Sequence, residues 1–302
     1  MKNSDLKYKL NKYNSNTAFF MITMLCIFVS VVYSQPYINN PVIPIQSSVP
    51  VQLGQSIITS YDPINLQYCV VRIVDLRNRP PFVPGGGFNY FPAEYAGVDW
   101  INSKLGNVFG IALDDNTNPN VFVARSTVYC SVNNDPVIPD QAIIYRLDGG
   151  NLGVSTFIKK NNIPGPPQAN VDWIPNTGTG LGNLCFDKWH QQIFITNHED
   201  GMIYRVKNIA GSGQVKSWYD FNQADNPTPG FAPLGERLWG IGVYGTNANN
   251  VRVYFSRWRF DKARPPGSSV DFNETWSIAL DAYGEFVPSS LTREIEIPYL
   301  GN

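Results

Sequence analysis

The stretch of residues 181–206, LGNLCFDKWHQQIFITNHEDGMIYRV, constrains the fold of this chain more than any other part of it. It contains three short apolar runs, at residues 184–186, 192–196 and 202–206, with polar turns between them. The middle run is rich in β-branched residues, and the last run follows Asp200-Gly201, a strong hairpin signal. The pattern predicts antiparallel strands that are joined by tight turns.

The same pattern recurs elsewhere in the chain, and a repeat is stronger evidence than a single motif. The tetrapeptide VDWI occurs at residues 98–101 and again at 171–174, 73 residues later. Ile111 and Asp114 precede Leu184 and Asp187 by the same 73 residues. The following strands also match, residues 121–124 with 193–196 and 144–147 with 203–206. A looser third copy has strands at 239–243, 251–256 and 275–278, and fourth strands are expected at 154–158, 215–221 and 285–287.

Repeated units of four antiparallel strands are typical of β-propeller blades, because one twisted sheet must bury its apolar face against the next. Only 16% of the residues are charged, and the 23 prolines and 25 glycines favour short strands and tight turns over helices. We therefore predict an all-β chain whose residues 61–302 form a β-propeller of four-stranded antiparallel blades. A sandwich or a solenoid is the alternative, but a sandwich does not predict that VDWI and the strands after it recur at the same spacing.

The predicted propeller is short. At spacings of 73 residues, or 57 between Leu184 and Ile241, residues 61–302 hold about four units. We expect the propeller to be small or incomplete, or the chain to be the N-terminal part of a longer one. The alternation at residues 293–298 favours truncation, because an open propeller leaves blade surface unpaired.

Tryptophans recur beside the predicted starts of the blades. Packing between blades is the favoured role, because each indole buries a large apolar area. A sugar-stacking platform is the alternative role. These residues are Trp100, Trp173 and Trp239.

The N-terminus has the pattern of a secretory signal, which we assign to residues 1–34. Four lysines precede an uncharged apolar run at residues 18–33, and cleavage is expected before Gln35. The protein is then secreted or held at the cell surface, with no membrane contact after cleavage. The alternative is an uncleaved anchor. Residues 35–60 contain four prolines and lack any period, so they are expected to form an extended lead-in.

Charge and cysteine content narrow the functional classes. Without residues 1–34 the chain carries 19 basic and 23 acidic side chains, which argues against nucleic-acid binding, because such binding requires a basic surface. Three cysteines remain. Cys185 is expected to be a buried residue that acts as a small apolar side chain. The sequence leaves undecided whether Cys69 and Cys130 form a disulfide.

The combination of Gly-x-apolar-x-apolar-Asp, then Ile-Phe-Ile-Thr-Asn, then Asp-Gly-x-Ile-Tyr-Arg-Val resembles the TolB-like propeller superfamily, including NHL-type blades. The resemblance covers roughly residues 61–302. The signal, the Pro/Asn-rich lead-in and the LGERLWGIGV motif at 234–243 also look like the propeller part of large exported bacterial surface proteins, some of them associated with gliding motility. Blade motifs specify a fold well and an activity poorly.

One polar cluster is the candidate binding site. It lies in a predicted hairpin turn and consists of Asn197, His198, Glu199 and Asp200. The favoured interpretation of this cluster is a polar turn. The resemblance implies a second possibility, since some relatives are lactonases with an axial divalent cation, and oxygen ligands suit calcium. Asp114 and Asp187 are the candidate ligands in that case, although capping of the following turn is the favoured role for both.

The sequence lacks a G-x-S-x-G elbow and has only two histidines, His190 and His198. His190 is expected to be solvated. The chain is therefore predicted to be a non-catalytic extracellular propeller, without a cofactor, that binds a protein or a glycan. The alternative is a calcium-dependent lactonase or esterase-like hydrolase.

Overall fold

The structure is a computed structural model that describes residues 45–46, 50–60, 66–77, 93–125, 143–159, 170–171, 174–175, 180–198, 200–221, 237–258 and 272–298. The chain divides into two compact units, Met1–Ile43 and Pro44–Asn302, and every described residue belongs to the second. Four sequence predictions fall outside the described residues. They concern the signal at residues 1–34, Cys130 as a disulfide partner, Trp173 and Glu199.

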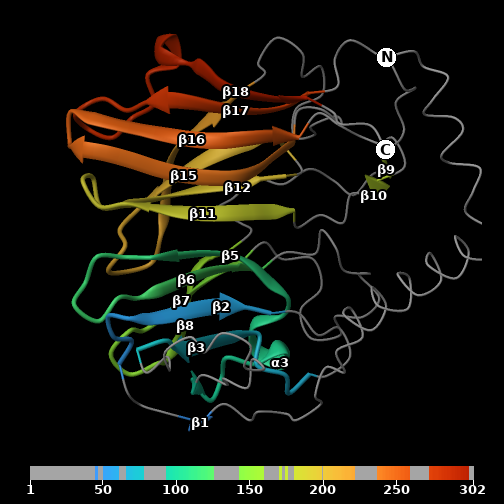
Figure 1. Cartoon of the computed structure of the whole chain (residues 1–302), viewed down its shortest axis with the longest axis vertical. Coiled ribbons are helices and arrows are strands. Elements are labelled where there is room, and N and C mark those ends of the chain that lie inside the picture. The colour runs from blue at the N-terminus through green and yellow to red at the C-terminus, as the bar shows by residue number, and fades with distance from the viewer. Residues whose placement is uncertain are drawn as a thin grey trace, which may run out of the picture. The chain divides into compact units, whose positions relative to one another are not determined.

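The described chain forms four four-stranded sheets, numbered here in chain order (Figure 1). The first contains β1 (Ile45–Gln46), β2 (Gln55–Thr59), β3 (Val71–Asp75) and β4 (Glu94–Ala96). The second contains β5 (Val108–Leu113), β6 (Val121–Arg125), β7 (Ile143–Leu147) and β8 (Val154–Lys159). The third contains β11 (Leu181–Asp187), β12 (Gln192–Asn197), β13 (Met202–Lys207) and β14 (Gln214–Asp220). The fourth contains β15 (Arg237–Asn247), β16 (Asn250–Trp258), β17 (Phe272–Ala279) and β18 (Thr292–Pro298).

The second, third and fourth sheets each run in chain order and are antiparallel throughout. In the first sheet β1 pairs with β4 in parallel, and the other pairs are antiparallel. The remaining described elements are short: β9 (Asn170–Val171), β10 (Ile174–Pro175), α3 (Asn102–Leu105) and the 3-10 turn η3 (Pro288–Ser290). The all-β class and the four-stranded antiparallel blades of a propeller-like fold are therefore confirmed, as is the expectation of about four blades.

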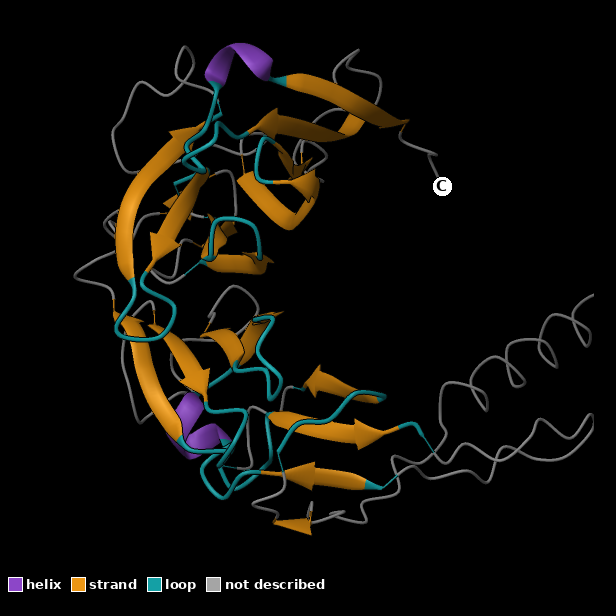
Figure 2. Ribbon diagram, turned by 90° about the vertical axis from the view of Figure 1, so that its left-hand side faces the viewer, coloured by secondary structure: helices purple, strands orange, loops and turns teal. Residues whose placement is uncertain are grey.

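Consecutive sheets stack through edge strands: β2 lies against β5, β5 against β11, and β11 against β15. Figure 2 shows the sheets following one another in this order. A separate apolar core fills each boundary between neighbouring sheets. Each blade therefore buries its faces against its neighbours, as the repeat pattern requires.

Trp100 and Cys185 each lie in one of these cores. Trp100 is fully buried between the first two sheets, and its Nε1 donates to the carbonyl of Leu152 at 3.0 Å. This is the position expected of a residue that packs between blades. Cys185 is buried at the boundary between the third and fourth sheets, where burial raises the pKa of its thiol.

The first strands approach one another closely because glycines interrupt them. Each of these strands has an irregular register, at Val108/Ile111 in β5, Leu181/Leu184 in β11 and Leu238/Ile241 in β15. A Cβ at Gly110 would lie 2.5 Å from the Gly182 carbonyl oxygen. Only glycine permits this separation between the second and third sheets, because real Cβ atoms do not approach a backbone oxygen so closely.

Hydroxyl groups satisfy the backbone where the register shifts. In β11 the Asn183 N–H donates to Thr196 Oγ1 at 3.0 Å, and in β15 the Gly240 N–H donates to Ser256 Oγ at 2.7 Å. These N–H groups would otherwise have lost their ladder partners. Thr196 also donates to the Trp239 carbonyl at 2.9 Å, which ties the third sheet to the fourth.

A repeated arginine joins each middle sheet to the next. Arg146, on β7, donates to the carbonyls of Ile209 and Ala210 in the β13–β14 turn, at 3.2 and 2.6 Å. Arg205 occupies the matching position on β13 and pairs with Glu285 in the connection between β17 and β18. The repeat of Ile-Tyr-Arg in the sequence thus marks a contact between blades.

Two expectations about strands were wrong. The fourth strand of the last copy is β18, whereas Phe286 makes only a single bridge to Leu280. Asp281 accepts bonds from the N–H groups of Tyr283 and Glu285, so it folds this segment into a turn. Secondly, residues 55–59 are not lead-in but β2, which pairs with β3 along its whole length.

Candidate functional site

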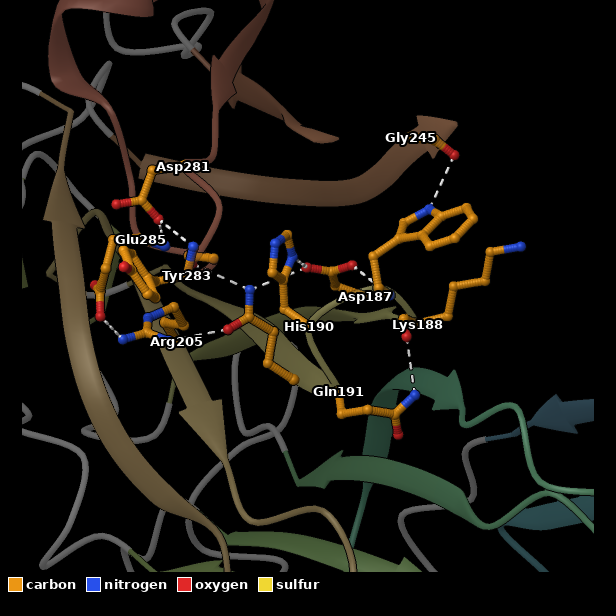
Figure 3. Close-up of polar contacts among 12 residues, drawn as sticks. Asp187, Lys188, His190, Gln191, Arg205, Gly245, Asp281, Tyr283 and Glu285 are labelled. Carbon is orange, nitrogen blue, oxygen red and sulfur yellow. Dashed lines mark hydrogen bonds and ion pairs between the residues drawn. The ribbon is translucent and has the colours of Figure 1, made fainter. Parts of the chain in front are cut away.

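The turn between β11 and β12 is organised by the carboxylate of Asp187, which is 1% exposed. The Trp189 N–H donates to it at 3.0 Å and Gln192 Nε2 at 3.0 Å, and His190 Nδ1 lies 2.6 Å from its Oδ2 atom (Figure 3). The side chain of His190 is 4% exposed. The expectation that His190 is solvated was therefore wrong.

The connection between β17 and β18 covers this histidine. Gly284 has a φ of 78°, and a Cβ there would lie 2.8 Å from His190 Cγ. Its carbonyl accepts a hydrogen bond from Gln192 Nε2 at 3.1 Å. The histidine is buried because a turn 94 residues further along the chain closes over it.

Gln192, the first residue of β12, extends the network to Arg205 on β13. Its Oε1 accepts a bond from Arg205 at 3.0 Å, and Arg205 Nε donates to Ser217 Oγ at 2.8 Å. Ser217 in turn donates to Glu285 at 2.8 Å, and Glu285 is the ion-pair partner of Arg205. The network runs from the buried Asp187, Gln192 and Arg205 to Glu285, whose side chain is 44% exposed, and so joins two blades.

Asp114 holds the equivalent turn of the second sheet. Its two oxygens accept bonds from the backbone N–H and the side-chain amide of both Asn116 and Asn120, at 2.6–3.2 Å. The side chain is buried, with the residue 7% exposed. Asp114 and Asp187 thus both cap the turn that follows their strand. In the fourth sheet the matching position is Tyr244, which is 67% exposed.

These carboxylates do not fit a calcium site. Calcium takes six to eight oxygen ligands, whereas the oxygens of Asp114 and Asp187 already accept bonds within their own turns. They also belong to different turns. Across the described residues, no group of three or more His, Cys, Asp and Glu side chains is placed to hold a metal ion.

The predicted polar cluster at residues 197–200 lies in the turn between β12 and β13, as expected, but its described side chains are buried. Asn197, His198 and Asp200 are each at most 3% exposed. Asp200 accepts bonds from Asn197 at 2.7 Å, from the Met202 N–H at 2.9 Å and from the Tyr204 hydroxyl at 2.5 Å. The cluster is an internal turn, and Glu199 lies outside the described residues.

His198 is neutral in this environment. Burial, together with the nearby charge of Arg237, lowers its pKa to about 3. Its ring meets the Trp239 ring edge-on, with 5.1 Å between centroids. The pKa of Tyr204 is raised, first by burial and then by the charge of Asp200.

An aromatic pair that the sequence did not predict lies beside His198. Phe109 on β5 contacts Trp239 on β15, with ring centroids 4.7 Å apart and planes at 47°. Gly182 stands at the matching position of β11, between them. Phe109, Gly182 and Trp239 follow one another at 73 and 57 residues, the same spacings as the repeat, so alignment of the three copies would have revealed the set.

Comparisons with known proteins add little to these observations. No protein-family model matches the sequence, and no curated protein matches it. Among solved structures, the chain is similar to the crystal structure of a protein from Lactobacillus plantarum, with a TM-score of 0.41 and 10% sequence identity. The likeness covers 82% of this chain and 68% of that chain. Within the described residues, no helix is both long and apolar enough to cross a membrane.

Proposed function

We propose that this chain is a non-catalytic, exported β-propeller module that binds a protein or a glycan at the cell surface. The observation that carries the proposal is the use of Asp114 and Asp187. Both are buried, and their oxygens accept hydrogen bonds within the turns that they cap. They are the repeated acidic residues of the blades, so they are where axial metal chemistry would be expected first.

The buried dyad of His190 and Asp187 also supports a structural role over catalysis. A general base must reach the proton that it removes. His190 is 4% exposed and lies beneath Gly284, while Asp187 is fully buried. The alternative, a calcium-dependent lactonase or esterase-like hydrolase, requires these groups to become accessible.

Export and a bacterial surface setting are part of the proposal. The lysine-rich segment and apolar run at residues 1–34 support export, and the resemblance to TolB-like and NHL-type blades of large exported surface proteins supports the setting. Propeller blades commonly present the loops between their strands to partners. The partner itself is proposed as a class, a protein or a glycan outside the cell.

Binding and hydrolysis assays on the purified full chain test the proposal. We expect saturable binding to at least one member of a panel of oligosaccharides and purified surface proteins, unchanged by EDTA, with no turnover of lactones or aryl esters. Turnover that calcium supports and EDTA abolishes would establish the hydrolase instead. Absence of both binding and turnover would remove the proposed function.

A further inference from the structure

The aromatic pair of Phe109 and Trp239 forms a preorganised surface on the first strands of two sheets. Phe109 is 39% exposed although its neighbours Val108 and Gly110 are buried, and Trp239 is partly exposed next to the buried Leu238. Their rings are held in contact at 4.7 Å because Gly182 places no side chain between them. A Cβ at Gly182 would lie 2.3 Å from Thr196 Oγ1 and 3.1 Å from the Trp239 carbonyl oxygen.

Hydrogen-bonding groups adjoin this pair. The Asn183 Oδ1 atom accepts bonds from the N–H groups of Leu184 and Ile111, at 2.9 and 3.4 Å, which fixes the orientation of the amide. Within the described part of the chain, its Nδ2 group donates to no partner, and the side chain is partly exposed. β5, β11 and β15 are edge strands of their sheets. The carbonyls of Phe109 and Trp239 already accept from the hydroxyls of Thr59 and Thr196, and each carbonyl keeps a second lone pair.

The surroundings of the pair favour an uncharged ligand. Charged side chains at these strand ends are buried: Arg125, Arg237 and Asp200 are each at most 2% exposed. His198, which contacts Trp239, is neutral at physiological pH. An anion or a cation would therefore lose its hydration without meeting an exposed countercharge on these residues.

We propose that Phe109 on β5 and Trp239 on β15 form a binding site for a neutral sugar ring, together with the amide of Asn183 on β11, the strand between them. A pyranose has an apolar C–H face that packs on aromatic rings, and hydroxyl groups that accept from an amide N–H and donate to backbone carbonyls. Both requirements are met on adjacent strands of three successive sheets. The inference rests on the proposed binding function and names glycan, rather than protein, as its ligand class.

Calorimetric titration tests the site, with neutral pentasaccharides of glucose, mannose and N-acetylglucosamine as probes and an oligogalacturonate as the anionic comparator. We expect at least one neutral probe to bind the full chain. Phe109→Ala and Trp239→Ala should weaken that binding about tenfold or more, which is the loss of one good aromatic contact. Trp239→Phe, which keeps a ring, should restore most of the affinity.

Trp218→Ala is the matched control, because Trp218 is 57% exposed but lies on β14, the fourth strand of its sheet. It should bind as the unmodified chain does. The inference is overturned if no neutral probe binds, if only the oligogalacturonate binds, or if the control loses as much affinity as Trp239→Ala. Binding to a protein partner that is unaffected by Phe109→Ala would overturn the sugar site and leave the proposed function standing.

Discussion

Substitution of Gly110 by alanine tests whether the blades stack as closely as described. The added Cβ would lie 2.5 Å from the carbonyl oxygen of Gly182 and 3.0 Å from the Cα of Asn183, both backbone atoms of the next sheet. Backbone cannot rotate away as a side chain can, so β5 and β11 must separate. Overpacking of this kind costs about 1–3 kcal/mol of unfolding free energy.

Gly242→Ala is the matched control. Gly242 lies on β15, a Cβ there would meet nothing within 4 Å, and its φ is outside the left-handed region. Alanine at such a position should leave stability unchanged or raise it by about 0.4–1 kcal/mol, through the entropy of the unfolded chain. Urea unfolding midpoints at constant m-value measure both changes. A Gly110→Ala protein as stable as Gly242→Ala would refute the close approach of the second and third sheets.

Three further perturbations test other contacts. Trp100→Ala should lower the unfolding free energy by about 3–5 kcal/mol, because the indole is fully buried between two sheets; a loss under about 1 kcal/mol in urea unfolding would contradict that burial. His198, whose folded pKa of about 3 lies below the usual 6.5, should cause stability to fall as pH decreases between these values, since the unfolded chain takes the proton first. The slope should reach about 1.4 kcal/mol per pH unit, and His198→Gln should flatten it in pH-dependent urea titrations. Arg146→Met should lower the unfolding free energy by about 1–2 kcal/mol, because the carbonyls of the 209–211 turn lose their donor. Amide hydrogen exchange should speed up in that turn, and faster exchange in distant strands alone would contradict the contact.

The strands of the three repeated copies could be predicted from sequence because each combines alternating or β-branched residues with a turn signal. Ile193 and Val206 are examples, paired within the hairpin of β12 and β13. β2 was missed because its surroundings are rich in proline. Ile57 pairs with Ile73, and that pairing, rather than local pattern, makes the segment a strand.

The site was less predictable because its geometry depends on contacts between blades. His190 has the sequence context of an exposed turn, and it is buried because Gly284, in the connection between β17 and β18 of the next blade, covers it. His198 is likewise internal, although it lies in a polar run. The pairing of Phe109 with Trp239 requires a glycine on the strand between them, a relation that appears only when three copies are superposed.

Titration of the full chain with calcium in a calorimeter tests most directly the claim that the blade carboxylates hold turns and not a metal. Asp187 is buried and accepts bonds from Trp189 and Gln192, so we predict no saturable heat at stoichiometric calcium. Asp187→Asn should then change unfolding stability but not the titration. Binding of one calcium ion per chain with a dissociation constant of about 10 µM or tighter, abolished by Asp187→Asn, would contradict the account.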